Sequence, residues 1–478
     1  MSVKKDFRFY IIMLITLFFM FGFGYLPTFS EITPAGMRVL GIFLGCVFAW
    51  CFGEIMWPSV LGLVCLTLYD FGTIDSNFAS TYGNGTAAML LVAIIFCFAI
   101  ERSGLLNELA MWITGQKWAQ KSIWSLVLAF YLAAILIGAI ATNIVPPIVL
   151  LWALFYEVAK EIGIKPYDKI AIIILLGIGV VGFVGCIIMP YNIMTVAVIG
   201  AAEAYNPSFV YDVKSHLLLC LIVAAIYVPL LVFILKLLLG KHIKFKMPVK
   251  DAYRIHLTRS MKWTLVYLLL LVAMMIVPNF LTEENVFRVI FGNKLGILGC
   301  LMLLTVLMAL TKVEGKPILD IAESLGNVPW PMFLIVSTSL GISGYLTADE
   351  MGIVQTMIKI FEPLISGHSA LTITLIFLVI GLVLTNCIND IVTAVVLYPI
   401  AASFIIDAGG SIMLFTILFG QATFQGCFLP SASVAGAMFH GNTQWMKAKD
   451  VFFYITIMEI ILLAVLIFVT GLGHLMGI

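Results

Sequence analysis

The chain has 478 residues, of which 62% are hydrophobic and only 11% are charged. A soluble domain carries roughly 25% charged residues, so this composition excludes an ordinary water-soluble protein. The formal net charge of +1 gives no reason to expect a nucleic-acid partner. Apolar runs such as 10–25 and 217–239 are long enough, at about 20 residues per span, to cross a lipid bilayer. We therefore expect an all-α, polytopic membrane protein.

The hydrophobic runs predict about 11 transmembrane helices and two re-entrant hairpins, arranged as two inverted repeats. The expected crossings, in chain order, lie near residues 9–27, 37–53, 56–71, 86–101, 169–204, 215–239, 263–281, 294–310, 329–346, 411–445 and 451–473. Two amphipathic segments, 103–116 and 347–362, precede the hairpins and are expected to lie in the membrane interface.

The expected domain organisation follows the same order. An N-terminal helix (1–30) precedes the first repeat (31–240), with its hairpin near 122–163 and its broken helix near 169–204. A basic cytoplasmic linker (241–262) leads to the second repeat (263–478), with its hairpin near 369–407 and its broken helix near 411–445.

The distribution of positive charge predicts the orientation. With the amino terminus in the cytoplasm, all 26 Lys and Arg residues face inward except Arg38, Lys214, Arg288, Lys294 and Lys359. The positive-inside rule requires such a skew, and it predicts a multi-pass protein of the cell (inner) membrane with its C-terminus outside. Treating each hairpin as two full crossings preserves the same sidedness, so charge alone does not establish re-entry.

Both repeats contain an apolar hairpin with a polar tip, followed by a long apolar helix interrupted at a proline. The first copy has its tip at 141–147 and its break at 189–192; the second has them at 385–391 and 429–433. Irregular backbone at membrane depth must be buried in protein or line a wet cavity. Paired interruptions in corresponding halves are typical of a transporter's binding site. The pattern therefore predicts a carrier.

The hairpin tips favour an anion. Each tip exposes the amino terminus of its returning helix, where free N–H groups and the helix dipole attract negative charge. Thr142 and Asn143 offer polar atoms at the first tip, and Asn389 and Asp390 take the equivalent places at the second. Asn143 and Asp390 are also good N-cap residues, and one side chain can serve both capping and binding. Ser433 adds a hydroxyl at the second break.

The tips and breaks contain no Lys or Arg. A bound anion would depend on dipoles, amides, hydroxyls and a bound cation. Backbone carbonyls with Asn, Thr and Asp oxygens are suitable ligands for sodium. Asp390 is an ionisable residue at membrane depth and therefore a functional candidate. Because its ionised form would repel an anionic substrate, we expect a sodium ion or a proton to accompany it.

At these residues the chain resembles the divalent anion/sodium symporter family, within the ion transporter superfamily. That family carries a Ser-Asn-Thr motif at each hairpin tip, and the matching triplets here are Thr142-Asn143-Ile144 and Asn389-Asp390-Ile391. Pro430-Ser431-Ala432-Ser433 resembles the family's proline–any residue–alanine–threonine break, and Pro190 and Asn192 match part of its Pro-Pro-Asn break. Both terminal threonines of the tip motif are isoleucine, which removes donors worth about 1 kcal/mol each.

The resemblance implies specific roles and a mechanism. The implied sodium ligands are Thr142, Asn143 and Gly185 in the first repeat and Thr385, Ile388, Asp390 and Ala432 in the second. The implied substrate contacts are Asn143, Asn389, Asp390 and Ser433. The resemblance also implies a homodimer in which a moving part crosses the membrane against a scaffold, an elevator mechanism.

The sequence thus predicts a secondary active transporter for a small organic anion of the di-/carboxylate class, coupled to sodium or protons. Two alternatives within transport are a sodium-independent anion exchanger and a cation/proton antiporter centred on Asp390. An intramembrane enzyme or biogenesis factor is the alternative from another class. The chain has no nucleophile-elbow, zinc-protease or Walker spacing, so we expect no enzyme activity.

Overall fold

The computed structural model describes residues 7–206, 208–240, 251–365 and 367–477. The first ten residues of the expected linker (241–250) and the start of the expected N-terminal helix lie outside the described residues. Within the described part the fold is helical, which confirms the all-α prediction. The strands there, β1 (Lys312–Val313) and β2 (Lys316–Pro317), form one antiparallel turn.

The first half of the chain contains the following helices. They are α1 (Phe7–Leu17, continued by η1, Phe18–Gly22, and η2, Phe23–Tyr25), α2 (Pro34–Phe52), α3 (Met56–Leu68), α4 (Ile74–Thr81), α5 (Gly85–Ser103), α6 (Leu105–Thr114), η3 (Ala119–Lys121), α7 (Ile123–Ile140), α8 (Val145–Ile162), α9 (Lys169–Cys186), α10 (Ile193–Tyr205) and α11 (Val213–Leu239). Polar caps set several starts: Thr33, Asn84 and Asp212 accept backbone N–H groups at the starts of α2, α5 and α11.

The second half repeats the order of long helix, hairpin and broken helix. It contains α12 (Arg259–Ile276, continued by η5, Val277–Phe280), η6 (Arg288–Leu295), α13 (Gly296–Leu310), α14 (Ile321–Gly326), α15 (Trp330–Leu346), η7 (Asp349–Met351), α16 (Ile353–Ile365), α17 (Ala370–Thr385), α18 (Asp390–Asp407), α19 (Ile412–Thr423), α20 (Val434–Gly441) and α21 (Ala448–Met476).

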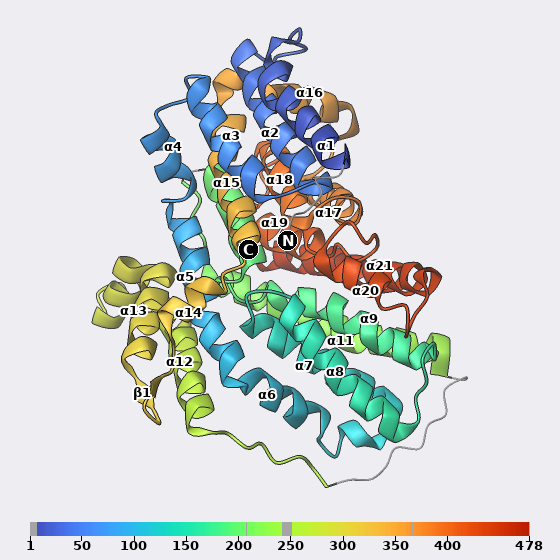
Figure 1. Ribbon diagram of the computed structural model, residues 1–478. Helices are drawn as coiled ribbons and strands as arrows, with labels where there is room; N and C mark the ends of the chain where they lie inside the picture. Colours follow the sequence, from blue (N-terminus) through green and yellow to red (C-terminus); the bar gives the residue numbers. More distant parts are fainter. Residues whose placement is uncertain (1–6, 207, 241–250, 366, 478) are drawn as a thin grey trace.

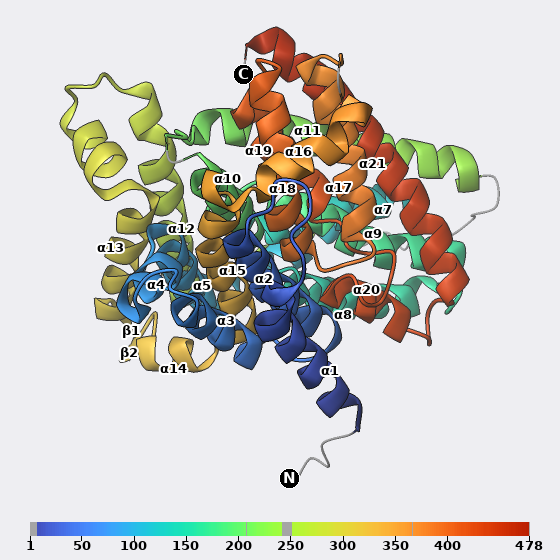
Figure 2. The ribbon, with the colours of Figure 1, turned by 90° about the horizontal axis from the view of Figure 1, so that it is seen from above.

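Ten helices of the described chain are long and apolar enough to cross a membrane, and further apolar helices are shorter. The hairpins occur where the sequence predicts them, as α7–α8 and α17–α18, and both expected helix breaks are present between α9 and α10 and between α19 and α20. The expected interfacial segments are helices α6 and α16. The sequence did not predict the short helices α4 and α14. Figure 2 shows α1 and the carboxyl-terminal end of α21 at opposite edges of the molecule.

The helices form two groups that both halves of the chain build together. One group contains α7–α11 and α17–α21, where α9 packs on α7 and α21, and α17 packs on α19 and α21. The other contains α1–α5 and α12–α15, where α3 packs on α15 and α13 packs on α5. Helix α10 joins the groups, since it packs on α18 within its own group and on α15 and α5 of the other. Figure 1 shows α12 and α13 at one edge and α20 and α21 at the opposite edge.

Glycines allow α7 and α9 to approach closely. A Cβ on Gly138 would collide with the backbone carbonyl of Gly182, and a Cβ on Gly185 would collide with the backbone of Ile135. At the same interface the Tyr131 hydroxyl donates to the Ile173 carbonyl at 2.7 Å. Small residues are a common way for membrane helices to gain packing contact. This interface holds the first hairpin against the first broken helix.

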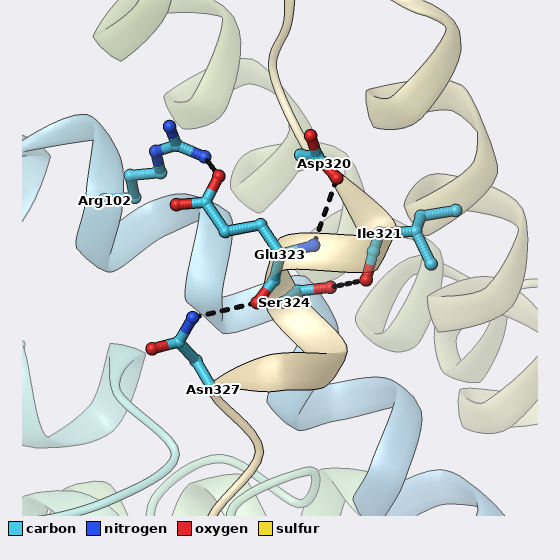
Figure 3. A network of polar contacts seen from close by, with 6 residues as sticks. All are labelled: Arg102, Asp320, Ile321, Glu323, Ser324 and Asn327. Atoms are coloured by element: carbon cyan, nitrogen blue, oxygen red, sulfur yellow. Dashed lines mark hydrogen bonds and ion pairs between the residues drawn. The ribbon is translucent and has the colours of Figure 1, made fainter.

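A polar contact at the end of α5 ties the two halves of the chain (Figure 3). The Arg102 guanidinium forms an ion pair with the Glu323 carboxylate of α14. Asp320 caps α14 by accepting from the backbone N–H of Glu323 at 3.1 Å, and Asn327 donates to the Glu323 carbonyl at 2.8 Å. Because both charged side chains are about half exposed, the pair contributes at most about 1 kcal/mol. The main effect of the Arg102–Glu323 pair is therefore to position α14 next to the end of α5.

Replacing Gly138 by Ala tests the α7–α9 packing. The added methyl group must displace the backbone of α9, so Gly138→Ala is expected to destabilise the protein by about 1–3 kcal/mol. The measurement is the melting temperature of the purified protein in detergent. Gly471→Ala is the matched control, because this helical glycine of α21 has open space around the new Cβ. Equal melting temperatures for the two variants would contradict this packing.

Candidate anion site at four helix ends

One cavity lies where the two hairpin tips meet the two helix breaks. It has about 500 Å³ of empty space, part of it open to solvent. Its walls are Thr142, Asn143, Ile144, Phe183, Ile193, Met194, Met332, Asn389, Asp390, Ile391, Phe424, Ser433 and Val434. These residues include the amino-terminal ends of α8, α10, α18 and α20. Four segments that are far apart in the sequence therefore contribute helix starts to a single space.

Asparagines build both hairpin tips in the same way. Asn143 Oδ1 accepts the backbone N–H of Val145 at 3.0 Å. Asn389 Oδ1 accepts the backbone N–H groups of Ile391 at 3.1 Å and Val392 at 3.3 Å. Asn143 thus occupies the same place in the first tip as Asn389 in the second. The alignment of the tip motifs pairs Asn143 with Asp390 instead, so the two pairings differ by one residue.

The expectation that Asp390 serves as an N-cap is wrong. Asn389 is the cap, and Asp390 is the first residue of α18. The asparagine amide can accept N–H groups without bringing a charge into the membrane interior. The Asp390 carboxyl group is directed instead to partners on another segment of the chain.

Side chains also form hydrogen bonds with the backbone at the two helix breaks. Asn192 caps α10 by accepting the Met194 N–H at 3.1 Å, and its Nδ2 donates to the Ala141 carbonyl at 2.7 Å, which ties the first break to the first tip. Ser433 caps α20 by accepting the Gly436 N–H at 3.0 Å and donates to the Gly426 carbonyl at 2.5 Å. These contacts satisfy backbone groups that lipid could not satisfy.

The electrostatics of the cavity favour an anion. Each helix start carries roughly half a positive elementary charge, and four such starts surround the space. None of the described residues that line it is Lys, Arg or His. The positive potential therefore comes from backbone dipoles, as in other anion sites at helix ends.

Asp390 is the ionisable residue among those lining the cavity, and it is buried. Thr385 Oγ1 lies 2.8 Å from Asp390 Oδ1 and also contacts the Thr423 carbonyl. A hydroxyl group has one proton, so it cannot donate to both oxygens. The Thr385 hydroxyl therefore donates to one of the two oxygens, and the other oxygen stays available as an acceptor. Gly426 approaches the same carboxyl group so closely that a Cβ there would overlap Asp390 Oδ1.

The structure brings together five of the residues singled out from the sequence. Thr142, Asn143, Asn389, Asp390 and Ser433 all line the cavity.

The other four residues singled out from the sequence lie around the cavity rather than in its wall. Thr385 lies behind Asp390, and Ile388 is half-buried at the second tip. Ala432 is fully buried in the second break, and Gly185 packs against α7. The sodium-ligand roles implied for these residues remain predictions.

Sequence reasoning placed Asn386 near the second tip but missed its contacts, and it missed Gln425 and Met332. Asn386 joins the second tip to the second break, because its Oδ1 accepts the backbone N–H groups of Cys427 at 3.0 Å and Phe428 at 2.8 Å. Gln425 is completely buried in that break, and neither polar atom of its amide has a hydrogen-bond partner. Met332 brings α15 of the other helix group into the wall. Only the tertiary contacts reveal these roles.

Comparison with known families is consistent with this architecture. A sequence model of the citrate transporter family matches residues 46–420, which is more than half of the chain. The chain belongs to the citrate transporter family. This membership confirms the resemblance to transporters of the ion transporter superfamily. No curated protein matches the sequence.

Two solved transporter structures share the fold. The YdaH transporter of Alcanivorax borkumensis superposes with a TM-score of 0.60 at 14% identity, over 86% of this chain and 89% of that one. MtrF of Neisseria gonorrhoeae, which is described as illuminating a class of antimetabolite efflux pumps, superposes with a TM-score of 0.50 at 12% identity, over 98% of this chain and 95% of that one. At these identities the likeness shows the fold alone.

Cysteine labelling tests where the cavity lies. In a background in which the exposed Cys387 is replaced by Ser, Ser433→Cys is expected to react with a small thiol reagent, because Ser433 lines the cavity. Ala432→Cys is the matched control and is expected to stay unreactive, because Ala432 is fully buried. The measurement is the labelled fraction of each purified variant by mass spectrometry. Equal labelling of the two neighbours would show that the cavity does not reach Ser433.

Proposed function

We propose that the protein is a secondary active transporter that binds a small organic polycarboxylate, of the citrate type, in the cavity between the two hairpins. The convergence of four helix starts on a space without basic side chains is the observation that supports this most strongly. The membership in the citrate transporter family supports the same substrate class.

The tip chemistry suits carboxylates. Backbone N–H groups occupy the amide oxygens of Asn143 and Asn389, which leaves the amide NH₂ groups of both side chains as donors. Carboxylates accept hydrogen bonds at each oxygen, so two donor-rich tips can hold two carboxylate groups of one molecule. The apolar wall of Phe183, Met332 and Phe424 excludes water around such a ligand and strengthens these bonds.

Charge balance calls for a bound cation. An ionised Asp390 would repel a polycarboxylate, and three oxygens lie together beside it: Asp390 Oδ1, the Thr385 hydroxyl and the Thr423 carbonyl. We propose that sodium or a proton fills this position and is transported together with the anion. For sodium, the hydroxyl of Thr385, the carboxylate of Asp390 and nearby carbonyls are hard oxygen ligands of the right type.

We propose an elevator motion between the two helix groups. The group that holds both hairpins and both broken helices contains most of the cavity wall, and Met332 of α15 comes from the other group. A movement of the first group along α15 would carry the site with it. The homodimer, the cytoplasmic amino terminus and the external carboxyl terminus are part of the same proposal, and they rest on the family resemblance and the distribution of Lys and Arg.

Replacing Asp390 by Asn tests the coupling role. Asn keeps the shape of the side chain but cannot ionise, so uptake of labelled citrate by Asp390→Asn is expected to lose its dependence on a sodium gradient or a pH gradient. The measurement is uptake into proteoliposomes with each gradient imposed separately, and with internal citrate to detect exchange.

Three outcomes of this experiment separate the alternatives. Unchanged sodium and pH dependence in the purified variant would refute the coupling role. Uptake by the wild-type protein only against internal citrate would favour an anion exchanger. Ion-driven pH changes in vesicles that contain no citrate would favour a cation/proton antiporter.

Ligand-induced stabilisation tests the substrate class. A ligand that binds the folded protein at about 100 times its Kd stabilises it by about 2.7 kcal/mol. Citrate and dicarboxylates are therefore expected to raise the melting temperature of the purified protein, and sodium to change that increase if it is the coupling ion. Sulfate and neutral amino acids serve as controls. Stabilisation by amino acids but not by carboxylates would contradict the proposed class.

A further inference from the structure

A second buried carboxyl group lies outside the cavity, on the last helix. Glu459 is 8% exposed and lies 11 residues after Ala448, which begins α21. At 1.5 Å per residue, Glu459 lies roughly 17 Å from the start of α21. The helix is long enough to span the hydrocarbon layer. An ionisable residue at such depth is expensive and by default a functional candidate.

The hydrogen bonds of Glu459 fit the protonated acid. Its Oε2 accepts from Asn386 Nδ2 at 2.8 Å, while its Oε1 is buried and has no hydrogen-bond partner. A carboxylate with one neutral partner leaves most of its charge uncompensated in a low-dielectric interior. A carboxylic acid in the same place keeps the bond from Asn386 and carries its proton on Oε1.

The groups that face Glu459 supply no compensating positive charge. The Asp390 carboxyl group and the Cys427 thiol interact electrostatically with Glu459 and bring no positive charge. The Tyr227 hydroxyl of α11 donates to the carbonyl of the neighbouring Met458 at 3.1 Å. The His440 ring of α20 lies 4.9 Å from the Phe452 ring of α21, which is two turns from Glu459 along that helix. Among the other elements packed on α21, helices α17 and α19 contain no acidic or basic residue, and α9 carries Lys169 and Cys186 at its two ends.

Asn386 connects Glu459 to the candidate anion site. Its Nδ2 donates to Glu459 and to the Leu382 carbonyl at 2.9 Å, and its Oδ1 accepts from Cys427 and Phe428 in the second break. All of its strong hydrogen-bonding positions are thus occupied. The preceding residue, Thr385, contacts Asp390. The two buried carboxyl groups therefore lie on either side of one hairpin tip and belong to the same helix group.

We propose that Glu459 is a proton-binding site, separate from the anion cavity, that carries a coupling proton with the hairpin group. The carboxylate takes a proton on Oε1 from water on one side of the membrane and releases it to water on the other side. The role in transport rests on the proposed function, whereas the protonation itself does not.

Infrared spectroscopy tests the protonation without a substrate. At neutral pH the wild-type protein is expected to show a carbonyl-stretch band of a buried carboxylic acid that Glu459→Gln lacks. Gln keeps the oxygen that accepts from Asn386, so the variant preserves that contact. Glu284→Gln, at an exposed position, is the matched control and should retain the band. Glu459→Asp keeps an acid and should shift the band instead of removing it. If Glu459→Gln keeps all the carboxylic-acid bands of the wild-type protein, the proposal is overturned.

Transport of labelled citrate tests the coupling. For one coupled proton, a gradient of about one pH unit supports up to about tenfold accumulation. The wild-type protein and Glu284→Gln are expected to show this accumulation, and Glu459→Gln to lose it. Equal accumulation in all three would overturn the coupling role of Glu459. If the wild-type protein does not move citrate under any gradient, the proposed function fails, and the infrared result still decides whether Glu459 holds a proton.

Discussion

The structure depends on how the chain satisfies backbone groups where its helices are interrupted among apolar segments. Neither lipid nor an apolar core can pair with a free N–H or carbonyl group, so each interruption needs a side chain that can. Asn192 serves the first break and also binds the Ala141 carbonyl of the first tip. Asn386 serves the second break by accepting two of its backbone N–H groups. The side chains that satisfy the backbone groups of each break thus also connect each broken helix to its hairpin.

The same solution creates the chemistry of the site. Neutral caps leave the helix dipoles uncompensated, so four helix starts make the cavity attractive to an anion although no described residue lining it is basic. An ionised Asp390 opposes this positive potential, because it adds a negative charge to the cavity wall. Its carboxyl group bonds to the Thr385 hydroxyl, which also contacts the Thr423 carbonyl. In the proposed function a proton or a cation balances this carboxyl group, so that anion binding and cation binding are linked through it.

The sequence predicts much of the fold because hydrophobic length and interruption are local properties. Polar tips between apolar runs located the hairpins at 122–163 and 369–407, and prolines located the helix breaks near 189–192 and 429–433. Five of the candidate residues were found because they are polar residues in otherwise apolar stretches.

The failures concern side chains whose partners lie far away in the sequence. Asn and Asp are both good caps, so sequence reasoning could not tell that Asn389 takes the cap while Asp390 turns to Thr385 and Gly426. The contact between Asn386 and Glu459 spans 73 positions and has no local signature. The close packing of Gly185 against the backbone of α7 has no local signature either.

A density map of the protein in a lipid nanodisc with citrate would show where the anion binds. We expect density for the anion between the starts of α8 and α18, within contact of Asn143 and Asn389, with both hairpin tips inside the hydrocarbon layer. Citrate bound elsewhere, or either tip exposed to bulk water at the membrane surface, would contradict this expectation.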